Sequence, residues 1–249
     1  RPRPRTRPEP APHMRLLRAA VLAAVCAILV AQAVATKLLV DRARETALMA
    51  AQDTAERISR AVEASINRSF VQVDAMLAGL PAILGEFVRS EAFDADAAGR
   101  VLRELNNQNF TFRDVLLVGL DGRPLTSSLA VSRRRPLPVD VNTSFVDVSP
   151  NAGGVMIGGP VRNPTTGEWA LFFARPVTIQ GLGPVFAVAE VPVPVVAALL
   201  AAGGAAPGLR VTLERDEGTL LASNPHDETR IGRQLPATVL AQLRAQAAV

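Results

Sequence analysis

Tyrosine is absent from the 249 residues of the chain, and cysteine and tryptophan occur only once each. The single cysteine, Cys26, has no second thiol with which to form an internal disulfide. Two histidines, His13 and His226, are a poor basis for a histidine-based metal site. The sequence therefore predicts a fold that uses no disulfide, no metal and no other cofactor.

Catalytic signatures are also missing. The chain has no Gly-x-Ser-x-Gly elbow, no His-Glu-x-x-His, no Cys-x-x-Cys and no P-loop lysine. The glycine pairs at 153–154 and 158–159 precede no helical pattern that would present its N-terminus to a phosphate. Asp94 and Asp96 lie near a predicted helix start, where capping accounts for them. We expect no catalytic residues here, so any enzymatic activity would belong to a part of the protein beyond Val249.

Positive charge is concentrated at the N-terminus. The net charge is +4, but residues 1–18 hold six of the 27 basic residues and one of the 23 acidic residues. The remaining 21 basic and 22 acidic residues nearly cancel. A basic tail suits anionic lipid headgroups, whereas no basic patch interleaved with aromatics supports stacking on single-stranded nucleic acid. We expect a membrane as partner and no nucleic acid.

A charge-free apolar run follows the tail at residues 19–36. Eighteen helical residues at about 1.5 Å each span roughly 27 Å, close to the hydrocarbon thickness of a bilayer. Because positive charge stays on the cytoplasmic side, the chain after this run should lie outside the membrane. We therefore predict a cytoplasmic tail at residues 1–18, an inner-membrane (cell-membrane) helix at residues 19–40 and a periplasmic or extracellular remainder.

A cleaved secretory signal is the alternative interpretation of the same run. Residues 14–18 would be its basic start, residues 19–30 its apolar core and residues 31–35 its small-residue cleavage site. A retained anchor is favoured because the helical pattern continues beyond the run without a turn signal. Both interpretations export the rest of the chain.

Apolar residues recur at intervals of three and four over residues 41–90, which predicts a long juxtamembrane helix. Gly79 and Pro81 should kink or end it, since proline removes the hydrogen bond to Leu77. The apolar stripe of this helix either packs on the sheet of its own domain or pairs with a second copy of the chain. We expect a homodimer, and leave open whether it forms in this fragment.

Turn residues divide the next part of the chain into strands, after a second helix with Asp94 as N-cap. The predicted strands are residues 113–120, 124–129, 154–161, 168–177 and 184–193. A hairpin at residues 210–223 then repeats the first one, with an apolar strand, an acidic-glycine turn and a strand ending in serine. We predict an α/β fold with a membrane-distal lobe at residues 91–195 and the start of a second, truncated lobe at residues 196–249.

Several polar and aromatic residues near strand ends are candidates for ligand binding. They are Ser127, Ser128, Arg133, Arg135, Trp169, Phe173 and Arg175. Arg175 follows Trp169 and Phe173 on one strand face, and an arginine beside aromatics can clamp a carboxylate. The serines could donate hydrogen bonds, and the loop arginines could form a rim for an anion. Each also has a purely structural explanation, as a strand end, a surface charge or a solvated loop.

Several segments together resemble a bacterial double-Cache (dCache or PDC) sensor domain. The most specific are Gly158-Gly159-Pro160-Val161 with its Asn-Pro-x-x-Gly turn, and the segment DEGTLLASNP followed by IGR. The resemblance covers roughly residues 15–249. It implies a long helix that carries two PAS-like lobes built on antiparallel sheets, with a small solute bound in the membrane-distal lobe. Family members that bind amino acids use tyrosines and an Arg-x-Trp-Tyr run. In this chain the corresponding loop, after the second predicted strand, reads SRRRPLPVDV. Amino-acid binding by that motif is therefore not expected.

The function implied by the resemblance is ligand sensing in a transmembrane signalling receptor, most readily a sensor histidine kinase. A diguanylate cyclase or a chemoreceptor is the alternative output, and an anchored or secreted ectodomain that senses nothing is a further alternative. We expect a small-molecule ligand, and the candidate arginines open the option of an anionic one. The sequence identifies neither the ligand nor the output domain.

Overall fold

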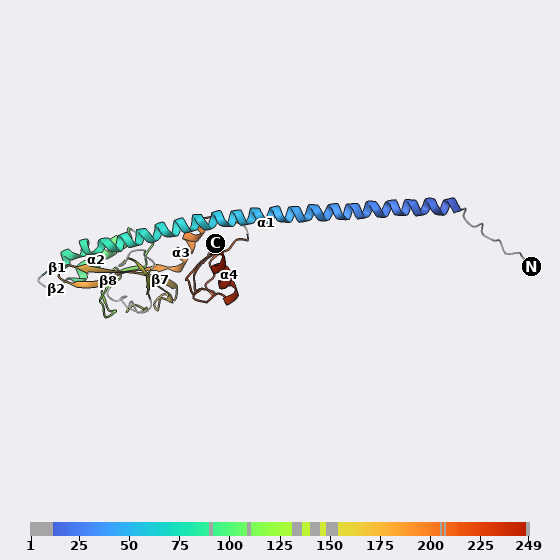
Figure 1. The fold of residues 1–249 in the computed structure, drawn as a ribbon. Coiled ribbons are helices and arrows are strands. Elements are labelled where there is room, and N and C mark those ends of the chain that lie inside the picture. Colours follow the sequence, from blue (N-terminus) through green and yellow to red (C-terminus); the bar gives the residue numbers. More distant parts are fainter. Residues whose placement is uncertain are drawn as a thin grey trace, which may run out of the picture. The chain divides into compact units, whose positions relative to one another are not determined.

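The computed structural model describes residues 12–247, apart from residues 90–91, 109–110, 131–135, 140–144, 148–153, 205 and 207. The chain divides into two compact units, Arg1–Glu56 and Arg57–Val249. The helix α1 (Pro12–Leu84) runs through both of them (Figure 1). We describe each unit separately.

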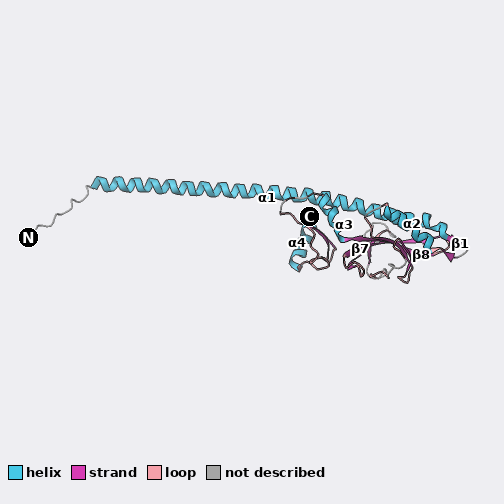
Figure 2. Ribbon diagram, turned by 180° about the vertical axis from the view of Figure 1, so that it is seen from behind, coloured by secondary structure: helices cyan, strands magenta, loops and turns pink. Residues whose placement is uncertain are grey.

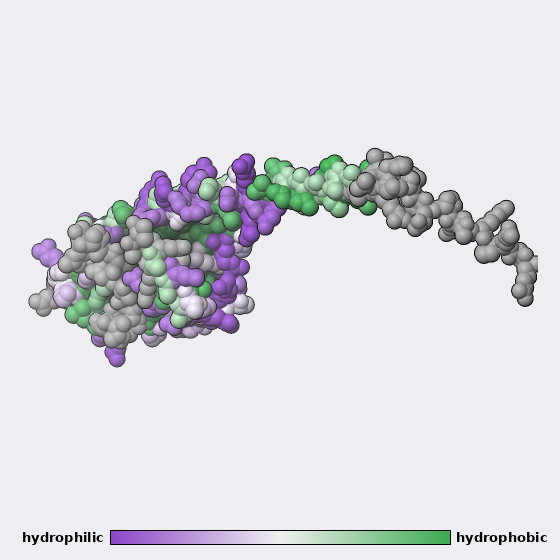
Figure 3. Space-filling model, turned by 45° about the vertical axis from the view of Figure 1, so that its right-hand side comes forward, coloured by the Kyte–Doolittle hydropathy of each residue, from purple (hydrophilic) through white to green (hydrophobic). Residues whose placement is uncertain are grey.

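The first unit is the N-terminal part of α1. From residue 20 to residue 53 every side chain is exposed, including residues 20–36 of the apolar run. In Figure 3 this run is a green, apolar surface that gives way to purple, polar residues along the helix. It is long and apolar enough to cross a bilayer, a test that a signal sequence near an N-terminus also passes. Exposed apolar side chains in such a helix are stabilised by lipid.

The second unit begins with the C-terminal part of α1. Its buried residues recur at intervals of three, four and seven, as expected for one face of a helix. They are Val62, Ile66, Val73, Leu77, Leu80 and Leu84. Pro81 lies inside the helix, which ends only at Leu84 and continues into the 3-10 turn η1 (Gly85–Phe87). The helix therefore ends three residues beyond the proline that was expected to kink or end it.

A short hairpin and a second helix follow α1. The strands β1 (Val88–Arg89) and β2 (Ala92–Phe93) pair antiparallel, and α2 extends over Ala95–Asn107. Asp94 caps α2, since its Oδ1 accepts a hydrogen bond from the Ala97 backbone N–H at 2.9 Å. The cap predicted from the sequence is confirmed.

One six-stranded antiparallel sheet forms the centre of the unit, in the order β4-β3-β8-β7-β6-β5. Its strands are β3 (Asp114–Val118), β4 (Pro124–Ser127), β5 (Phe145–Asp147), β6 (Met156–Arg162), β7 (Trp169–Ile179) and β8 (Gly183–Pro192). The five predicted strands are confirmed, with bounds shifted by one to two residues at most ends. The sequence analysis missed β5, a strand of three residues at the edge of the sheet.

The two faces of the sheet are covered differently. On one face, Leu117, Leu171 and Phe173 pack in a large core that includes the apolar residues of α1 and α2. On the other, Leu116 and Phe172 belong to a smaller cluster that contacts the loop residue Leu137. We call these the helix face and the loop face. Figure 2 shows α1 and α2 on the same side of the strands.

The C-terminal part of the unit contains a second hairpin. After α3 (Val193–Ala202), the strands β9 (Val211–Glu214) and β10 (Leu220–Asn224) pair antiparallel, and α4 (Ala237–Ala247) follows. The repeated hairpin predicted from the sequence is confirmed. The α/β fold with a long N-terminal helix and an antiparallel sheet is confirmed as well.

Candidate functional site

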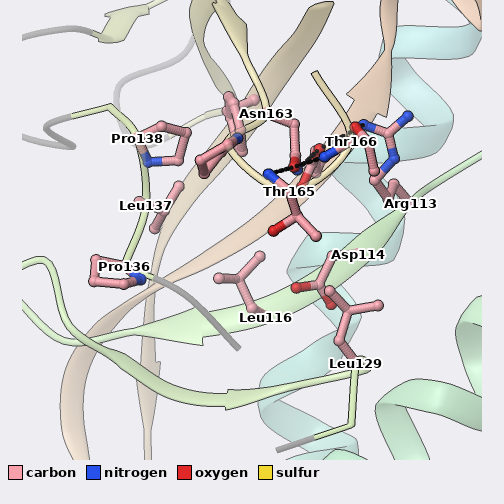
Figure 4. A pocket seen from close by; sticks show the side chains of 13 residues that line it. Arg113, Asp114, Leu116, Leu129, Pro136, Leu137, Pro138, Asn163, Thr165 and Thr166 are labelled. Atoms are coloured by element: carbon pink, nitrogen blue, oxygen red, sulfur yellow. Dashed lines mark hydrogen bonds and ion pairs between the residues drawn. The ribbon is translucent and has the colours of Figure 1, made fainter. Parts of the chain in front are cut away.

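A cavity of about 390 Å³ opens on the loop face of the sheet. Its lining comprises Arg113, Asp114, Leu116, Leu129, Pro136, Leu137, Pro138, Asn163, Pro164, Thr165, Thr166, Phe172 and Glu190. These residues come from β3 and the residue before it, from β7 and β8, from the β6–β7 turn and from the segment after β4. The side chains of Asp114 and Leu116 point from the sheet toward the turn that carries Thr165, with Pro136 and Pro138 beside the same space (Figure 4).

Asp114, the first residue of β3, places a carboxylate at the floor of the cavity while only 6% of the residue is exposed. The Ser127 hydroxyl donates to both carboxylate oxygens, at 2.8 and 2.7 Å, and the Ser128 hydroxyl donates to Oδ1 at 2.6 Å. Burial raises the pKa of Asp114 above its usual value, and the two serine hydroxyls oppose that rise. A buried carboxylate with several donors is a built site, since leaving it without partners would be costly.

Glu190 lies directly opposite Asp114, on the neighbouring strand β8. It is also 6% exposed. Its Oε1 accepts hydrogen bonds from Asn163 Nδ2 at 2.7 Å and from Arg113 Nη1 at 3.1 Å. Burial is the main cause that raises the pKa of Glu190; Asn163 and Arg113 lower it and the Asp114 charge adds to the rise. Two buried carboxyl groups therefore lie side by side on the floor of the cavity.

The β6–β7 turn forms the rim of the cavity and is held by its own side chains. Asn163 Oδ1 accepts from the backbone N–H groups of Thr165 at 2.8 Å and Thr166 at 3.1 Å. Gly167, at φ +73°, closes the turn with a 2.8 Å hydrogen bond to the Asn163 carbonyl. Arg113 also donates to Thr166 Oγ1 at 3.0 Å and pairs with Glu168. The rim and the floor thus share Asn163 and Arg113.

The charge of the described lining is acidic. It contains two carboxyl groups, from Asp114 and Glu190, and one guanidinium, from Arg113. That guanidinium is already paired with Glu190 and with Glu168. Phe172 and several leucine and proline side chains supply the apolar part of the wall. Such a lining favours a small molecule with a positive group and an apolar part.

The structure brings two of the predicted site residues to this cavity indirectly. Ser127 and Ser128 are buried below it and hold the carboxylate of Asp114, as described above. Arg133 and Arg135 lie outside the described residues, which resume at Pro136. Their role as an anion-binding rim stays a prediction.

The other three predicted residues lie away from the cavity. Phe173 is on the helix face, with its ring 5.1 Å from that of Phe70 in α1 in an edge-to-face arrangement. Arg175 pairs with Asp74 of α1. The guanidinium of Arg162 lies over the ring of Trp169, with its Cζ 4.7 Å from the ring centroid. The sequence placed Phe172 and Phe173 on opposite faces correctly, but Phe172 is the aromatic residue that lines the cavity.

Sequence reasoning missed the acidic floor. Asp114 and Glu190 are single carboxyl groups within otherwise apolar strands, DVLLV and GPVFAVAEVP. An acidic residue in an apolar strand is a signal for a buried polar site, because burial without partners is unfavourable. Their pairing across β3 and β8 depends on the strand order, which the sequence did not indicate.

Solved structures share this fold, although no family model matches the chain and no curated protein matches it. The extracellular domain of a histidine-kinase candidate, rpHK1S-Z16, aligns with a TM-score of 0.56 at 18% identity, over 77% of this chain and 78% of that one. The ligand-binding domain of the Pseudomonas aeruginosa PAO1 amino acid chemoreceptor PctB, in complex with L-Arg, aligns with a TM-score of 0.54 at 16% identity, over 74% of each chain. The sensory domain of the Campylobacter jejuni chemoreceptor Tlp3, with isoleucine bound, gives 0.53 at 10% identity, over 77% and 78%.

These alignments define the class of fold. The chain has the fold of the extracellular sensory domains of histidine kinases and chemoreceptors. The fold that the double-Cache resemblance implied is thereby confirmed.

Proposed function

We propose that this chain is the ligand-sensing module of a bacterial transmembrane receptor, and that the cavity on the loop face binds its ligand. The observation that carries the proposal is the pair of buried carboxyl groups, Asp114 and Glu190, at the floor of a 390 Å³ cavity. Burial of two like charges side by side is unfavourable, and the one guanidinium in the described lining, that of Arg113, is shared between Glu190 and Glu168. A cationic ligand that neutralises the pair would offset this cost.

The ligand chemistry that fits best is a small molecule carrying an ammonium or guanidinium group. The positive group would lie against Asp114 and Glu190, and its apolar part against Phe172 and Leu116. The related structures with bound L-Arg and isoleucine support this choice, because both compounds carry an α-ammonium group. An anionic group on the ligand, as predicted from Arg133 and Arg135, is compatible with a positive group on the same ligand, since an amino acid is a zwitterion.

The membrane arrangement belongs to the same proposal. The apolar run of α1 would anchor the chain in the inner membrane, with the basic tail in the cytoplasm and the second unit in the periplasm. The full receptor would act as a homodimer. Its output would be a histidine kinase of a two-component system, with a chemoreceptor or a diguanylate cyclase as the alternative. The similarity to sensory domains of both kinases and chemoreceptors supports an output of this general kind.

A thermal-shift screen of the full chain in detergent micelles tests the proposal. The panel is L-arginine, L-isoleucine, putrescine and succinate, each from micromolar to millimolar concentration. A compound at 100 times its Kd should add about 2.7 kcal/mol to the free energy of unfolding. We expect stabilisation by at least one of the three amines, and its loss in Glu190→Gln. A panel in which no compound stabilises the native chain would contradict the proposal.

A further inference from the structure

The β6–β7 hairpin contacts two different parts of the molecule. Its tip, residues 163–166, lines the cavity. Its stem contacts the C-terminal segment of the chain, which includes the β9–β10 hairpin and the residues after it. We call residues 225–234 the docking segment. The hairpin therefore contacts both the cavity and the C-terminal segment of the chain.

Trp169 makes the first contact between the stem and the docking segment. Its indole Nε1–H donates to the Glu228 carbonyl at 3.3 Å. Its ring also lies beside Gly232, where a Cβ would come within 3.4 Å of the indole Cη2. Gly232 has φ +77°, so both its backbone conformation and the close approach of the ring favour glycine. The docking segment is shaped to fit this side chain.

Arg162 links the tip of the hairpin to Trp169. Arg162 is the cross-strand partner of Trp169, and its guanidinium covers the indole ring. The same guanidinium donates to the Gly167 carbonyl in the turn at 2.7 Å. A shift of the turn therefore displaces the group that packs on the indole.

Arg215 makes a second contact, between the turn after β9 and β6. Its Nη2 donates to the carbonyls of Gly159 at 2.6 Å and Ile157 at 3.2 Å. These carbonyls border the irregularity in the β6–β7 pairing between Gly158 and Val161. A bulge leaves backbone groups without ladder partners, and the guanidinium supplies two donors there. The C-terminal part thus contacts both strands of the hairpin.

We propose that Trp169 and Arg215 are positioning residues that couple the cavity rim to the C-terminal part of the chain, Trp169 through the docking segment and Arg215 through the turn after β9. A change at Asn163–Thr166 would then alter the C-terminal hairpin and the docking segment. The inference rests on the proposed function in one respect, that the cavity is the ligand site. The coupling itself concerns contacts that exist without ligand. Ligand contact with the rim would bias the hairpin, and the two contacts would pass the bias toward the C-terminal end of the chain. Trp169 is thus assigned a role different from the ligand contact predicted for it.

The test is hydrogen exchange of the full chain in detergent micelles, without ligand, read by mass spectrometry. Asn163→Ala removes the acceptor for Thr165 and Thr166 and the donor to Glu190, so exchange should rise over residues 163–168. Coupling predicts that exchange over residues 228–233 also rises, by about threefold. Asp121→Ala is the matched control, since Asp121 Oδ1 accepts from Arg123 N–H in the turn between β3 and β4. It should leave residues 228–233 unchanged.

The second half of the test is a double-mutant comparison. In a Trp169→Ala background, Asn163→Ala should still raise exchange over residues 163–168 but no longer over residues 228–233. Trp169→Phe keeps a ring beside Gly232 and removes only the Nε1–H donor, so it should fold and retain part of the response. Arg215→Ala should likewise reduce the response.

Two results would overturn the coupling. One is no rise over residues 228–233 in Asn163→Ala itself. The other is that Asn163→Ala raises exchange over residues 228–233 equally in the native background and in the Trp169→Ala, Trp169→Phe and Arg215→Ala backgrounds. A merely structural role for Trp169 would raise basal exchange without changing the response to Asn163→Ala. Because no ligand is added, a negative result leaves the thermal-shift test of the cavity unaffected, and failure of that screen leaves this coupling intact.

Discussion

The two faces of the central sheet differ in what covers them and in what they bury. The helix face is closed by α1 and α2 and buries apolar side chains in one continuous core. The loop face has a smaller apolar cluster, and next to it the carboxyl groups of Asp114 and Glu190 line a cavity. Since adjacent residues of a strand alternate between faces, β3, β7 and β8 each contribute to the core on one side and to the cavity on the other. β7 shows this most directly, with Phe173 on the helix face and Phe172 on the loop face.

The largest expected effect is a difference in stability between these two phenylalanines. Phe173, 1% exposed, packs against α1 and borders a smaller cavity of about 150 Å³. Because its ring belongs to the large core, Phe173→Ala should lower the free energy of unfolding by about 4 kcal/mol. Phe172, 2% exposed, borders the cavity, where part of its surroundings is already empty. Phe172→Ala should cost about 3 kcal/mol, at the low end for a buried phenylalanine. Urea unfolding of the full chain, followed by circular dichroism, measures both; equal losses would contradict the difference between the faces.

Removing a donor from the acidic floor should have the next largest effect. Ser127→Ala deletes the hydroxyl that serves both oxygens of Asp114 and should cost about 2 kcal/mol at neutral pH. Ser69→Ala is the control, because the Ser69 hydroxyl donates only to the Ser65 carbonyl one turn earlier in α1. Its cost should stay within about 0.5 kcal/mol. The same unfolding titration compares them, and a control loss as large as that of Ser127→Ala would argue against a strained carboxylate.

The ion pair between the helix face and α1 should contribute less. Arg175 and Asp74 are partly exposed, and such pairs are typically worth about 0.2–1 kcal/mol. A double-mutant cycle with Arg175→Ala and Asp74→Ala should therefore give a coupling of about 0.5 kcal/mol. A coupling above about 2 kcal/mol would show that the pair, rather than apolar packing, holds α1 on the sheet.

The pH dependence of stability should show the smallest effect. Burial raises the pKa of Asp114 and of Glu190, so the folded state binds protons at a higher pH than the unfolded chain. The contribution of these two groups is therefore full below their ordinary pKa values and is lost as the pH rises through the raised ones. Glu190→Gln should reduce the gain in the free energy of unfolding on moving from neutral to mildly acidic pH. Parallel pH profiles of Glu190→Gln and the native chain would contradict this.

The architecture was largely predictable because its signals are local. The apolar run at residues 19–36, the cap at Asp94 and the turn at residues 163–167 each act within a few residues of chain. The five long strands follow from alternating or continuous apolar segments for the same reason. β5 escaped because three residues carry too little pattern to recognise.

The site was much less predictable because it depends on which strands become neighbours. Asp114 and Glu190 are 76 positions apart in the chain, and only the pairing of β3 with β8 places them opposite each other. Phe173 and Arg175 were assigned to the ligand because the sequence does not state which face α1 covers. The serines were predicted to contact the ligand, and in the structure the group they hold is the carboxylate of Asp114.

Titration calorimetry is the most direct test that the acidic floor of the loop face is the ligand site. The compound that stabilises the chain most in the thermal-shift screen is titrated into the native chain and into the variants Glu190→Gln and Asp74→Asn. Asp74→Asn is the control, because it removes a charge on the helix face. We predict that Glu190→Gln weakens binding by at least about tenfold, as expected for a lost charge-assisted contact. Asp74→Asn should change the Kd by less than about threefold, because Asp74 pairs with Arg175 away from the cavity. An unchanged Kd in Glu190→Gln, or a larger loss in Asp74→Asn, would contradict the account.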